Sequence, residues 1–398
     1  GTAQGEDELL SGGFCKKILC KEEILRGQEA FVAGKKEADM VRYLEKSEYG
    51  KCRPLWEEAF PEDSKSFADY YFSEKLPGSK VLAIEGEDGK LLTMAHLNPY
   101  IISVNGKKWE LPYIVGVATA ADQRHKGYMR QVLYKMLQDL NKEKKPFCFL
   151  MPAAEAIYRP FQFAFIYDQP VWKPGDEPEK GLKKRKLDLA EEAQSTAVWM
   201  NNWLEKRYEV YTVRDQAYME LLQKELESEA GEVTGWYEEN GKLHGLEAWW
   251  GLGKREERFY YSLSEMEPAD AHPAIMARIT DVKALLEMIC LKEDVPENRF
   301  QAVLSVKDPI VRENGGNWLW KLGKNGSTLE SMNGLGLQAE AEGSEQIPFS
   351  SEVLEINVDE LAQWIFGYRP LEEILTVAPP FWTEYVRTLQ GVFIDEVV

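Results

Sequence analysis

Histidine is scarce in this sequence, and so is cysteine. The four histidines lie far apart and are not paired with cysteine or carboxylate at ligand spacing, so we expect no metal. They are His96, His125, His244 and His272. The five cysteines are odd in number and scattered, which argues against a disulfide framework and favours free, mostly buried thiols. They are Cys15, Cys20, Cys52, Cys148 and Cys290.

Long apolar runs are also missing. No run reaches the roughly 20 residues that a membrane-spanning helix needs, and there is no charged and then apolar leader. We therefore expect a soluble, cytoplasmic protein. With 398 residues and 44% hydrophobic composition the chain can bury several cores, and two or three domains are expected.

Positive charge is in the minority, with 48 Lys and Arg against 67 Asp and Glu and a net charge of −19. Such a chain repels nucleic acid and anionic membranes but attracts cationic small molecules, so a polyamine is the expected partner. The alternative is that the acidity only keeps a large oligomer soluble. The basic run at residues 183–186 could form a patch that binds nucleic acid, but a solvated loop or the start of a strand is favoured.

The most informative segment has the order strand, polar turn, helix and strand. Residues 113–119 (YIVGVAT) have the length and β-branched content of a strand, and a polar turn follows at residues 121–127. Apolar side chains then recur at steps of one and three over residues 128–140, which indicates an amphipathic helix. A second strand is expected at residues 147–151, after a proline.

The turn before this helix has the composition of an anion site. Gly127 permits close approach of the backbone, and the free N–H groups of the first helical turn attract negative charge. Arg124, Lys126 and Arg130 add three cations, which favours a diphosphate. An Arg-x-x-Gly at the head of a helix is common by chance, so the order of the surrounding elements carries the interpretation.

That order continues with Ala153-Ala154 and then Ile157-Tyr158-Arg159. These residues, together with the basic run, glycine and arginine at residues 124–130, form a pattern that resembles the GNAT superfamily of N-acetyltransferases. More narrowly, it resembles the enhanced intracellular survival (Eis) acetyltransferases, over residues 40–398. The sequence departs from the family pattern at Met129, at Pro160 and at Gln162, where the family commonly has glycine.

The resemblance implies acetyl-CoA as co-substrate and a set of residues that hold it. Strand residues Val117, Ala118 and Thr119 would offer backbone groups to the pantetheine amides, as an added strand would. The diphosphate would be held by Arg124, His125, Lys126, Gly127, Tyr128, Met129 and Arg130. Ala153 and Ala154 match family positions that also line the CoA arm.

Acetyl transfer to an amine also needs a proton acceptor and a proton donor. The resemblance implies Tyr158 as the general acid, and its alternative role is a packed aromatic among Phe161 and its neighbours. It implies the terminal carboxylate of Val398 as the base, and the apolar residues 393–398 indicate a packed tail rather than a frayed one. Glu62 and Glu396 are the candidate ligands of the acceptor, and Asp395 approaches with the tail.

The function expected from this resemblance is transfer of acetyl from acetyl-CoA to a cationic, aminoglycoside-like polyamine, by direct attack in a ternary complex. A lysine of a protein or peptide is the alternative acceptor. A non-catalytic scaffold that binds lipid or a small molecule is the alternative from another class. Family members form hexamers built from trimers, so a homo-oligomer is expected.

Two similar hairpin signals indicate a duplicated unit. Residues 81–96 and 233–249 each hold two apolar runs around an Asp-Gly or Asn-Gly, and each follows a helical stretch. The first unit alone carries the phosphate turn. We expect an α+β (mixed α/β) chain with an N-terminal extension, possibly upstream of a natural start at Met40, and three domains. The extension is 1–39, the catalytic GNAT domain 40–172, the second GNAT-like domain 173–272 and a sterol-carrier-like domain 273–398.

Within the last domain, the pattern predicts a helix at residues 279–289 and strands near residues 300–306, 318–322 and 353–356. Two further helices are expected at residues 359–366 and 380–389. The sterol-carrier-like assignment comes from the resemblance, and the sequence itself shows no signal for a lipid tunnel.

Overall fold

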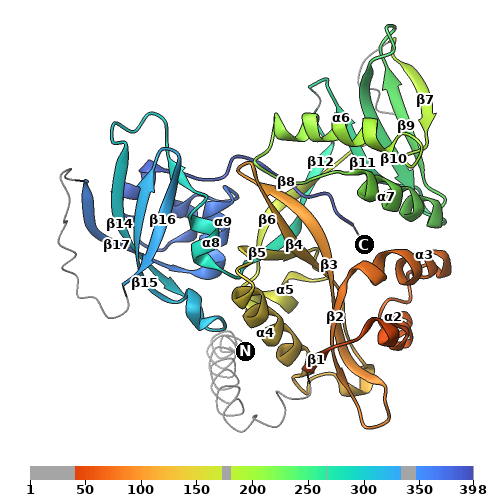
Figure 1. Cartoon of the computed structure of the whole chain (residues 1–398), viewed down its shortest axis with the longest axis horizontal. Helices are drawn as coiled ribbons and strands as arrows, with labels where there is room; N and C mark the ends of the chain where they lie inside the picture. The colour runs from red at the N-terminus through yellow and green to blue at the C-terminus, as the bar shows by residue number, and fades with distance from the viewer. Residues whose placement is uncertain (1–40, 173–180, 266, 333–346, 398) are drawn as a thin grey trace, which may run out of the picture.

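The computed structural model describes residues 41–172, 181–265, 267–332 and 347–397. Three expectations fall outside these ranges: the natural start at Met40, the extension before it and the catalytic carboxylate of Val398. Figure 1 shows three sheet-containing bodies around a central region that the C-terminal tail enters. Among the described helices, none is long and apolar enough to cross a membrane.

The first body is built on a nine-stranded sheet with the order β1-β2-β3-β4-β5-β12-β6, to which β8 and β19 are joined. Its strands from the first part of the chain are β1 (Val41–Tyr43), β2 (Lys80–Glu85), β3 (Leu91–Val104), β4 (Lys107–Thr119), β5 (Phe147–Leu150) and β6 (Ala164–Val171). The predicted hairpin at residues 81–96 is the β2–β3 pair. The predicted strands at 113–119 and 147–151 are the end of β4 and β5.

The helices of this body pack on both faces of the sheet. They are η1 (Lys46–Lys51), α2 (Cys52–Ala59), α3 (Lys65–Tyr70), η2 (Tyr71–Lys75), η3 (Leu76–Gly78), η4 (Ala121–Gln123), α4 (Tyr128–Lys142), α5 (Glu155–Tyr158) and η5 (Arg159–Phe161). The apolar side of α4 is buried through Val132, Leu133, Met136, Leu137 and Leu140, as its spacing predicts.

The second body is a four-stranded sheet with the order β11-β10-β9-β7, in which all pairings are antiparallel. Its elements are β7 (Lys183–Leu187), α6 (Ala193–Glu205), α7 (Gln216–Ser228), β9 (Glu232–Tyr237), β10 (Leu243–Trp250) and β11 (Glu256–Ser262). The predicted hairpin at 233–249 is β9–β10, and the basic run at 183–186 lies on the exposed strand β7. The strand β8 (Val210–Thr212) leaves this body and pairs with β3.

The boundary expected at residue 273 is wrong, because it falls inside a strand of the first sheet. Residues of β12 (Asp270–Ile279) pair with β5 and with β6, so β12 lies between two strands that follow each other in sequence. The apolar end of β12 is fully buried there, at Ile275, Met276, Ala277 and Ile279. Burial between two strands of the other body therefore decides which sheet this segment joins.

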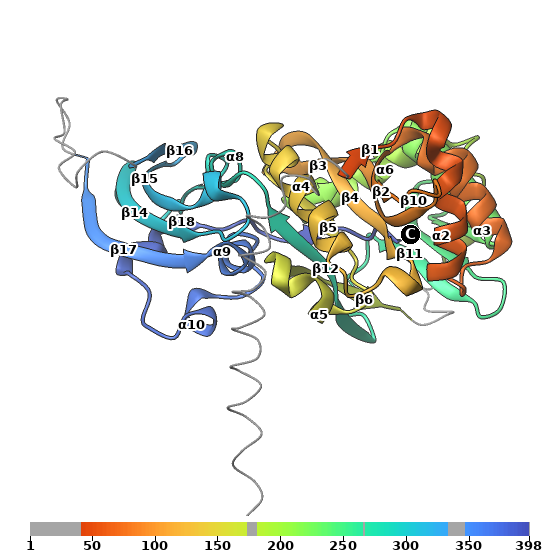
Figure 2. The ribbon, with the colours of Figure 1, turned by 90° about the horizontal axis from the view of Figure 1, so that it is seen from below.

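The third body holds a sheet with the order β16-β15-β14-β17, in which β17 runs parallel to β14. Its elements are α8 (Val282–Leu286), β13 (Cys290–Leu291), β14 (Arg299–Lys307), η6 (Arg312–Asn314), β15 (Gly316–Gly323), β16 (Gly326–Ser331), β17 (Phe349–Asn357), α9 (Val358–Ile365), α10 (Leu371–Ile374), η7 (Phe381–Tyr385) and β18 (Val386–Arg387). In Figure 2, α9 lies between this sheet and β12 of the first body.

Two predicted helices of this body are corrected. The helix expected at 279–289 is only the five residues of α8, because Ile279 still belongs to β12. The helix expected at 380–389 is the short η7, since Val386 and Arg387 pair with Leu291 and Cys290 as a two-stranded ribbon. The three predicted strands and the helix at 359–366 are confirmed as β14, β15, β17 and α9.

After β18 the chain returns to the first body. The strand β19 (Val392–Phe393) pairs in parallel with β8, and residues 392–396 are buried. The ring of Phe393 lies 4.9 Å from that of Tyr208 and 5.6 Å from those of Trp203 and Tyr261. The prediction of a packed tail is therefore confirmed through residue 396.

The backbone at Gln162 explains why the family commonly has glycine at this position. It ends η5 in the left-handed conformation, with φ of 63°, where a side chain costs about 1–2 kcal/mol and glycine does not. Glycine also loses more entropy on folding, so Gln162→Gly is expected to raise the free energy of unfolding by about 0.5–1 kcal/mol. Urea denaturation measures this. Gln138→Gly, inside α4, should instead lower stability by about 1 kcal/mol, and a loss at both positions would contradict the argument.

Candidate active site

Strands β4 and β5 part shortly after they meet, and this parting creates the site. They pair in parallel only at Tyr113 and Phe149. Strand β4 then continues to Thr119, still paired with β3, whereas β5 ends at Leu150. The edge of β4 beyond Tyr113 that faces β5 thus carries backbone groups without a strand partner, and an extended ligand can pair with such an edge. The predicted CoA-contacting residues Val117, Ala118 and Thr119 lie on this part of β4.

A β-bulge at Gly116 accompanies the parting. Between the pairs Met94–Ala118 and His96–Val115, β4 has one residue more than β3, and Gly116 takes φ of 59°. A Cβ atom added there would lie 2.7 Å from the Trp56 ring, so only glycine fits. The bulge therefore bends the part of β4 that borders the opening and brings Trp56 against it.

The turn at the head of α4 is exposed and basic. Gly127 caps the helix at φ of 82° without a side-chain hydrogen bond, and His125 is also left-handed. Arg124, His125, Lys126, Gly127 and Arg130 are exposed, whereas Tyr128 and Met129 are half-buried. Arg124 donates to the carbonyl of Thr119 and Lys126 to the side chain of Gln123, so neither contact is with a carboxylate. The N–H groups and cations remain available for a phosphate.

Tyr158 lies on the other side of the opening, at the end of α5. Ala153 and Ala154 are exposed in the loop between β5 and α5. The Tyr158 ring is buried and packs edge-on against Phe163, with 5.8 Å between centroids. Burial raises the pKa of Tyr158 to about 12. Among the described residues its hydroxyl has no hydrogen-bond partner, so it can still donate to a ligand.

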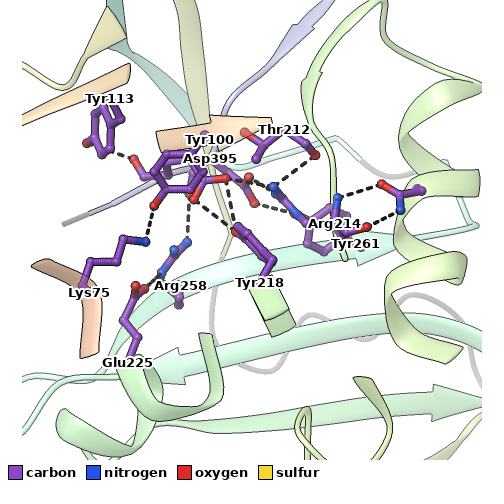
Figure 3. Close-up of polar contacts among 12 residues, drawn as sticks. Lys75, Tyr100, Tyr113, Thr212, Arg214, Tyr218, Glu225, Arg258, Tyr261 and Asp395 are labelled. Atoms are coloured by element: carbon purple, nitrogen blue, oxygen red, sulfur yellow. Dashed lines mark hydrogen bonds and ion pairs between the residues drawn. The ribbon is translucent and has the colours of Figure 1, made fainter. Parts of the chain in front are cut away.

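The tail enters a buried cluster of charges between the first and the second body (Figure 3). Arg214 donates to Asp395 Oδ1 at 2.5 Å and to Glu396 Oε1 at 2.8 Å. Arg258 donates to Glu225 at 2.9 Å and to the carbonyl of Asp395 at 2.8 Å. These side chains are at most 7% exposed. The charges are therefore paired inside the protein, as burial requires.

Tyrosines complete the cluster. Tyr261 donates to Asp395 at 2.5 Å, Tyr218 contacts the Glu396 carboxylate at 3.1 Å, and Tyr113 donates to the Glu396 carbonyl at 3.3 Å. Because Tyr113 marks the last pairing of β4 with β5, the tail touches the point where the strands part.

Lys75 is a further cation at this cluster. It donates to the hydroxyl of Tyr100 at 2.6 Å, and burial lowers the pKa of Lys75. Arg214, Arg258 and Lys75 could not be predicted from the sequence, because their partners lie far away along the chain. An apolar chain end that carries two adjacent acids, Asp395 and Glu396, was the one signal that such cations exist.

The expected acceptor ligand Glu396 is corrected by its position. Its side chain is 1% exposed, and its carboxylate forms an ion pair with Arg214 and accepts hydrogen bonds from Tyr218. It anchors the tail and does not face a ligand. Glu62 lies exposed on the turn between α2 and α3. Val398 follows the described tail and has no described position.

Acidic groups gather beside Trp56, near the bulge of β4. The indole of Trp56 donates to Asp63 at 2.8 Å. Burial raises the pKa of Asp63, the Trp56 hydrogen bond opposes this, and the charges of Glu62 and Glu229 raise it further. Glu229, from the second body, accepts a hydrogen bond from Ser64. The expected acceptor ligand Glu62 is thus one of two other acids near Asp63 and Trp56.

An open strand edge, a basic helix head and the phenol of Tyr158 are features that suit an acyltransferase with a CoA thioester. Residues 40–166 match the family model of the acetyltransferase (GNAT) domain. The chain therefore contains a GNAT domain, and it is an N-acetyltransferase. No protein in a search of curated sequences matches the chain.

Solved structures share the fold over nearly the whole chain. A probable N-acyltransferase from Enterococcus faecalis V583 has a TM-score of 0.67 at 17% identity, covering 87% of this chain and 93% of its own. A GCN5-related N-acetyltransferase from Kribbella flavida has a TM-score of 0.64 at 15% identity, with coverages of 90% and 98%. Eis1 from Mycobacterium abscessus has a TM-score of 0.61 at 11% identity, with coverages of 89% and 99%. The resemblance to Eis proteins is thus confirmed for the domain family and the fold.

Proposed function

We propose that this chain transfers the acetyl group of acetyl-CoA to an amine of a cationic small molecule, such as an aminoglycoside-like polyamine. The observation that carries the proposal is the parting of β4 and β5 beside the head of α4, which no side-chain hydrogen bond caps. In this arrangement the pantetheine pairs with β4 at Val117 and Thr119, and the diphosphate binds at Arg124 and Gly127.

The reaction proceeds by direct attack. The acceptor nitrogen forms a bond to the thioester carbonyl carbon, the carbon–sulfur bond breaks, and the amine proton passes to the terminal carboxylate of Val398. Tyr158 donates a proton to the departing thiolate, whose conjugate acid has an ordinary pKa of about 8.5. The buried tail supports this role of Val398, because residues 395 and 396 are fixed at the end of the opening.

The acids beside Trp56 support a cationic acceptor. Asp63, Glu62 and Glu229 lie near the bulged part of β4, where the acceptor must reach the thioester. Their charges attract an amine of a polycation, and their number suits an acceptor with several amines. Glu62 is thus retained as an acceptor ligand in the proposal.

Thiol release from acetyl-CoA tests this function with aminoglycosides, linear polyamines and lysine peptides as acceptors. Release with polycationic small molecules is expected, at a rate that salt lowers. If only lysine peptides gave thiol release, the acceptor would be a protein lysine instead of a small polycation. Binding of CoA without release for any acceptor would favour a non-catalytic scaffold.

Replacing Asp63 with asparagine is expected to raise KM for a polycationic acceptor about tenfold, which corresponds to ~1.4 kcal/mol. Asp63 supplies a half-buried negative charge beside Trp56, whereas acetyl-CoA pairs with the open edge of β4, so KM for acetyl-CoA should not change. Asp88→Asn, at the exposed tip of the β2–β3 hairpin, removes the same charge as a control. An equal rise in both variants would mean that only net charge matters.

The rest of the expected organisation belongs to the same proposal. The second body is a second GNAT-like domain without a CoA site, the third is a sterol-carrier-like scaffold, and copies assemble as hexamers built from trimers. The buried free thiols of Cys52, Cys148 and Cys290 suit a cytoplasmic location. Sedimentation at a mass of one chain would contradict the assembly.

A further inference from the structure

The tail needs an anchor, because regular structure ends early. Strand β19 has two residues and pairs with β8 at two positions, and residues 394–397 form no helix or strand. A chain end with so few backbone hydrogen bonds frays unless other groups hold it. Residues 394–396 are nevertheless buried. Side chains of the second body therefore hold the tail in place.

We propose that Arg214 and Arg258 are positioning residues that direct the end of the chain to the opening between β4 and β5. This inference rests on the proposed function, in which the terminal carboxylate is the base. Together with Tyr261 they form the tail clamp. Arg214 follows β8 and Arg258 lies on β11, so both belong to the part of the chain that lacks the CoA turn.

The contacts of the tail clamp fix side chains and backbone together. One guanidinium, that of Arg214, binds the carboxylates of two consecutive residues, which sets the rotation of the chain between Asp395 and Glu396. Arg258 binds the carbonyl of Asp395, and Tyr113 of β4 binds the next carbonyl. The backbone at Asp395 and Glu396 is thus held from both the second and the first body.

Charge balance requires all members of the cluster at once. Arg214, Arg258 and Lys75 face the carboxylates of Glu225, Asp395 and Glu396. The tail supplies two of these three carboxylates, so its departure would leave buried cations unpaired. The tail therefore stays docked as long as the guanidinium groups are in place. This arrangement assigns the second body a role in catalysis without a cofactor site of its own.

Replacing Arg214 with lysine tests the role, because lysine keeps the charge but cannot bind two carboxylates as a planar fork. We expect kcat to fall about 100-fold, since a displacement of about 1 Å costs that much, while KM for acetyl-CoA stays within about twofold. Carboxypeptidase digestion followed by intact mass gives a second readout. In the unmodified chain trimming should stop before Glu396, and in Arg214→Lys it should pass Asp395.

Arg42→Lys is the matched control. Arg42 also bridges two carboxylates, those of Glu48 and Glu85, but at the far edge of the first sheet. Its replacement should leave both kcat and the protected tail unchanged. Tyr261→Phe is the milder second variant, in case Arg214→Lys does not fold. It removes only the hydroxyl that contacts Asp395 and Arg214, and it should speed trimming and lower kcat.

The outcomes separate this inference from the proposed function. A protected tail and unchanged kcat in Arg214→Lys and Tyr261→Phe overturn the inference. A released tail with unchanged kcat also overturns it, because the tail then has no part in turnover. Absence of thiol release by the unmodified chain counts against the proposed function, and the digestion pattern still decides whether the clamp holds the tail.

Discussion

Replacing Tyr158 with phenylalanine is expected to lower kcat for acetyl transfer by about 10²- to 10⁴-fold, the range for loss of a general acid. The thiolate of CoA then leaves without a proton donor. The hydroxyl has no hydrogen-bond partner among the described residues, so its removal should change the free energy of unfolding by less than about 1 kcal/mol. Initial rates of thiol release and a urea denaturation curve measure the two effects.

The pKa of Tyr158 determines how kcat should change with pH. A phenol donates a proton only below its pKa, and burial raises the pKa of Tyr158 to about 12. The donor therefore stays protonated through pH 10, whereas a phenol of ordinary pKa, about 10, would be half ionised there. We expect no loss of kcat between pH 8 and pH 10 that depends on Tyr158.

Tyr134→Phe serves as the control for Tyr158→Phe. Tyr134 lies on α4 and packs edge-on against Phe161, at 6.1 Å between centroids, so it borders the same aromatic group without a proposed role in proton transfer. Its replacement should leave kcat within about twofold of the unmodified chain. If Tyr158→Phe retains full kcat, Tyr158 is a packed aromatic side chain and the proton comes from another group.

Local patterns made part of this site predictable from sequence. The end of β4, the glycine turn and α4 follow one another in the chain, and strand content, a left-handed glycine and a 3.6-residue period each leave a local signal. The bulge at Gly116 has a weaker signal. A glycine in a strand indicates a bulge or a close approach, but the sequence does not reveal that Trp56 is its neighbour.

Contacts between distant segments were beyond such patterns. No strand was predicted for the residues of β12, and its place between β5 and β6 depends on which sheet buries it better. Arg214 and Arg258 are 181 and 137 residues from Asp395, and no spacing rule links them. Glu396 was assigned to the acceptor because it lies near the chain end, whereas the buried guanidinium of Arg214 determines its actual role.

Extending the chain by two glycines beyond Val398 is expected to lower kcat by about 10²- to 10⁴-fold. The extension converts the carboxylate of Val398 to an amide, which is not a base, and moves the new carboxylate by up to about 7 Å. The anion turn and the open edge of β4 are unchanged, so the affinity for CoA should stay the same. Thiol release and CoA titration measure both.

A self-cleaving intein fused after Val398 provides the control within one preparation. The fusion carries the amide, and cleavage restores the carboxylate at the same residue, so kcat should recover on cleavage. After cleavage, kcat should also fall at low pH, since a carboxylate accepts a proton only above its pKa, which is ordinarily about 3.5. A fusion with full kcat before cleavage would exclude the terminal carboxylate as base. Because residues 395 and 396 are fixed beside Tyr113, a water held near the parting of β4 and β5 would then be the next acceptor to test.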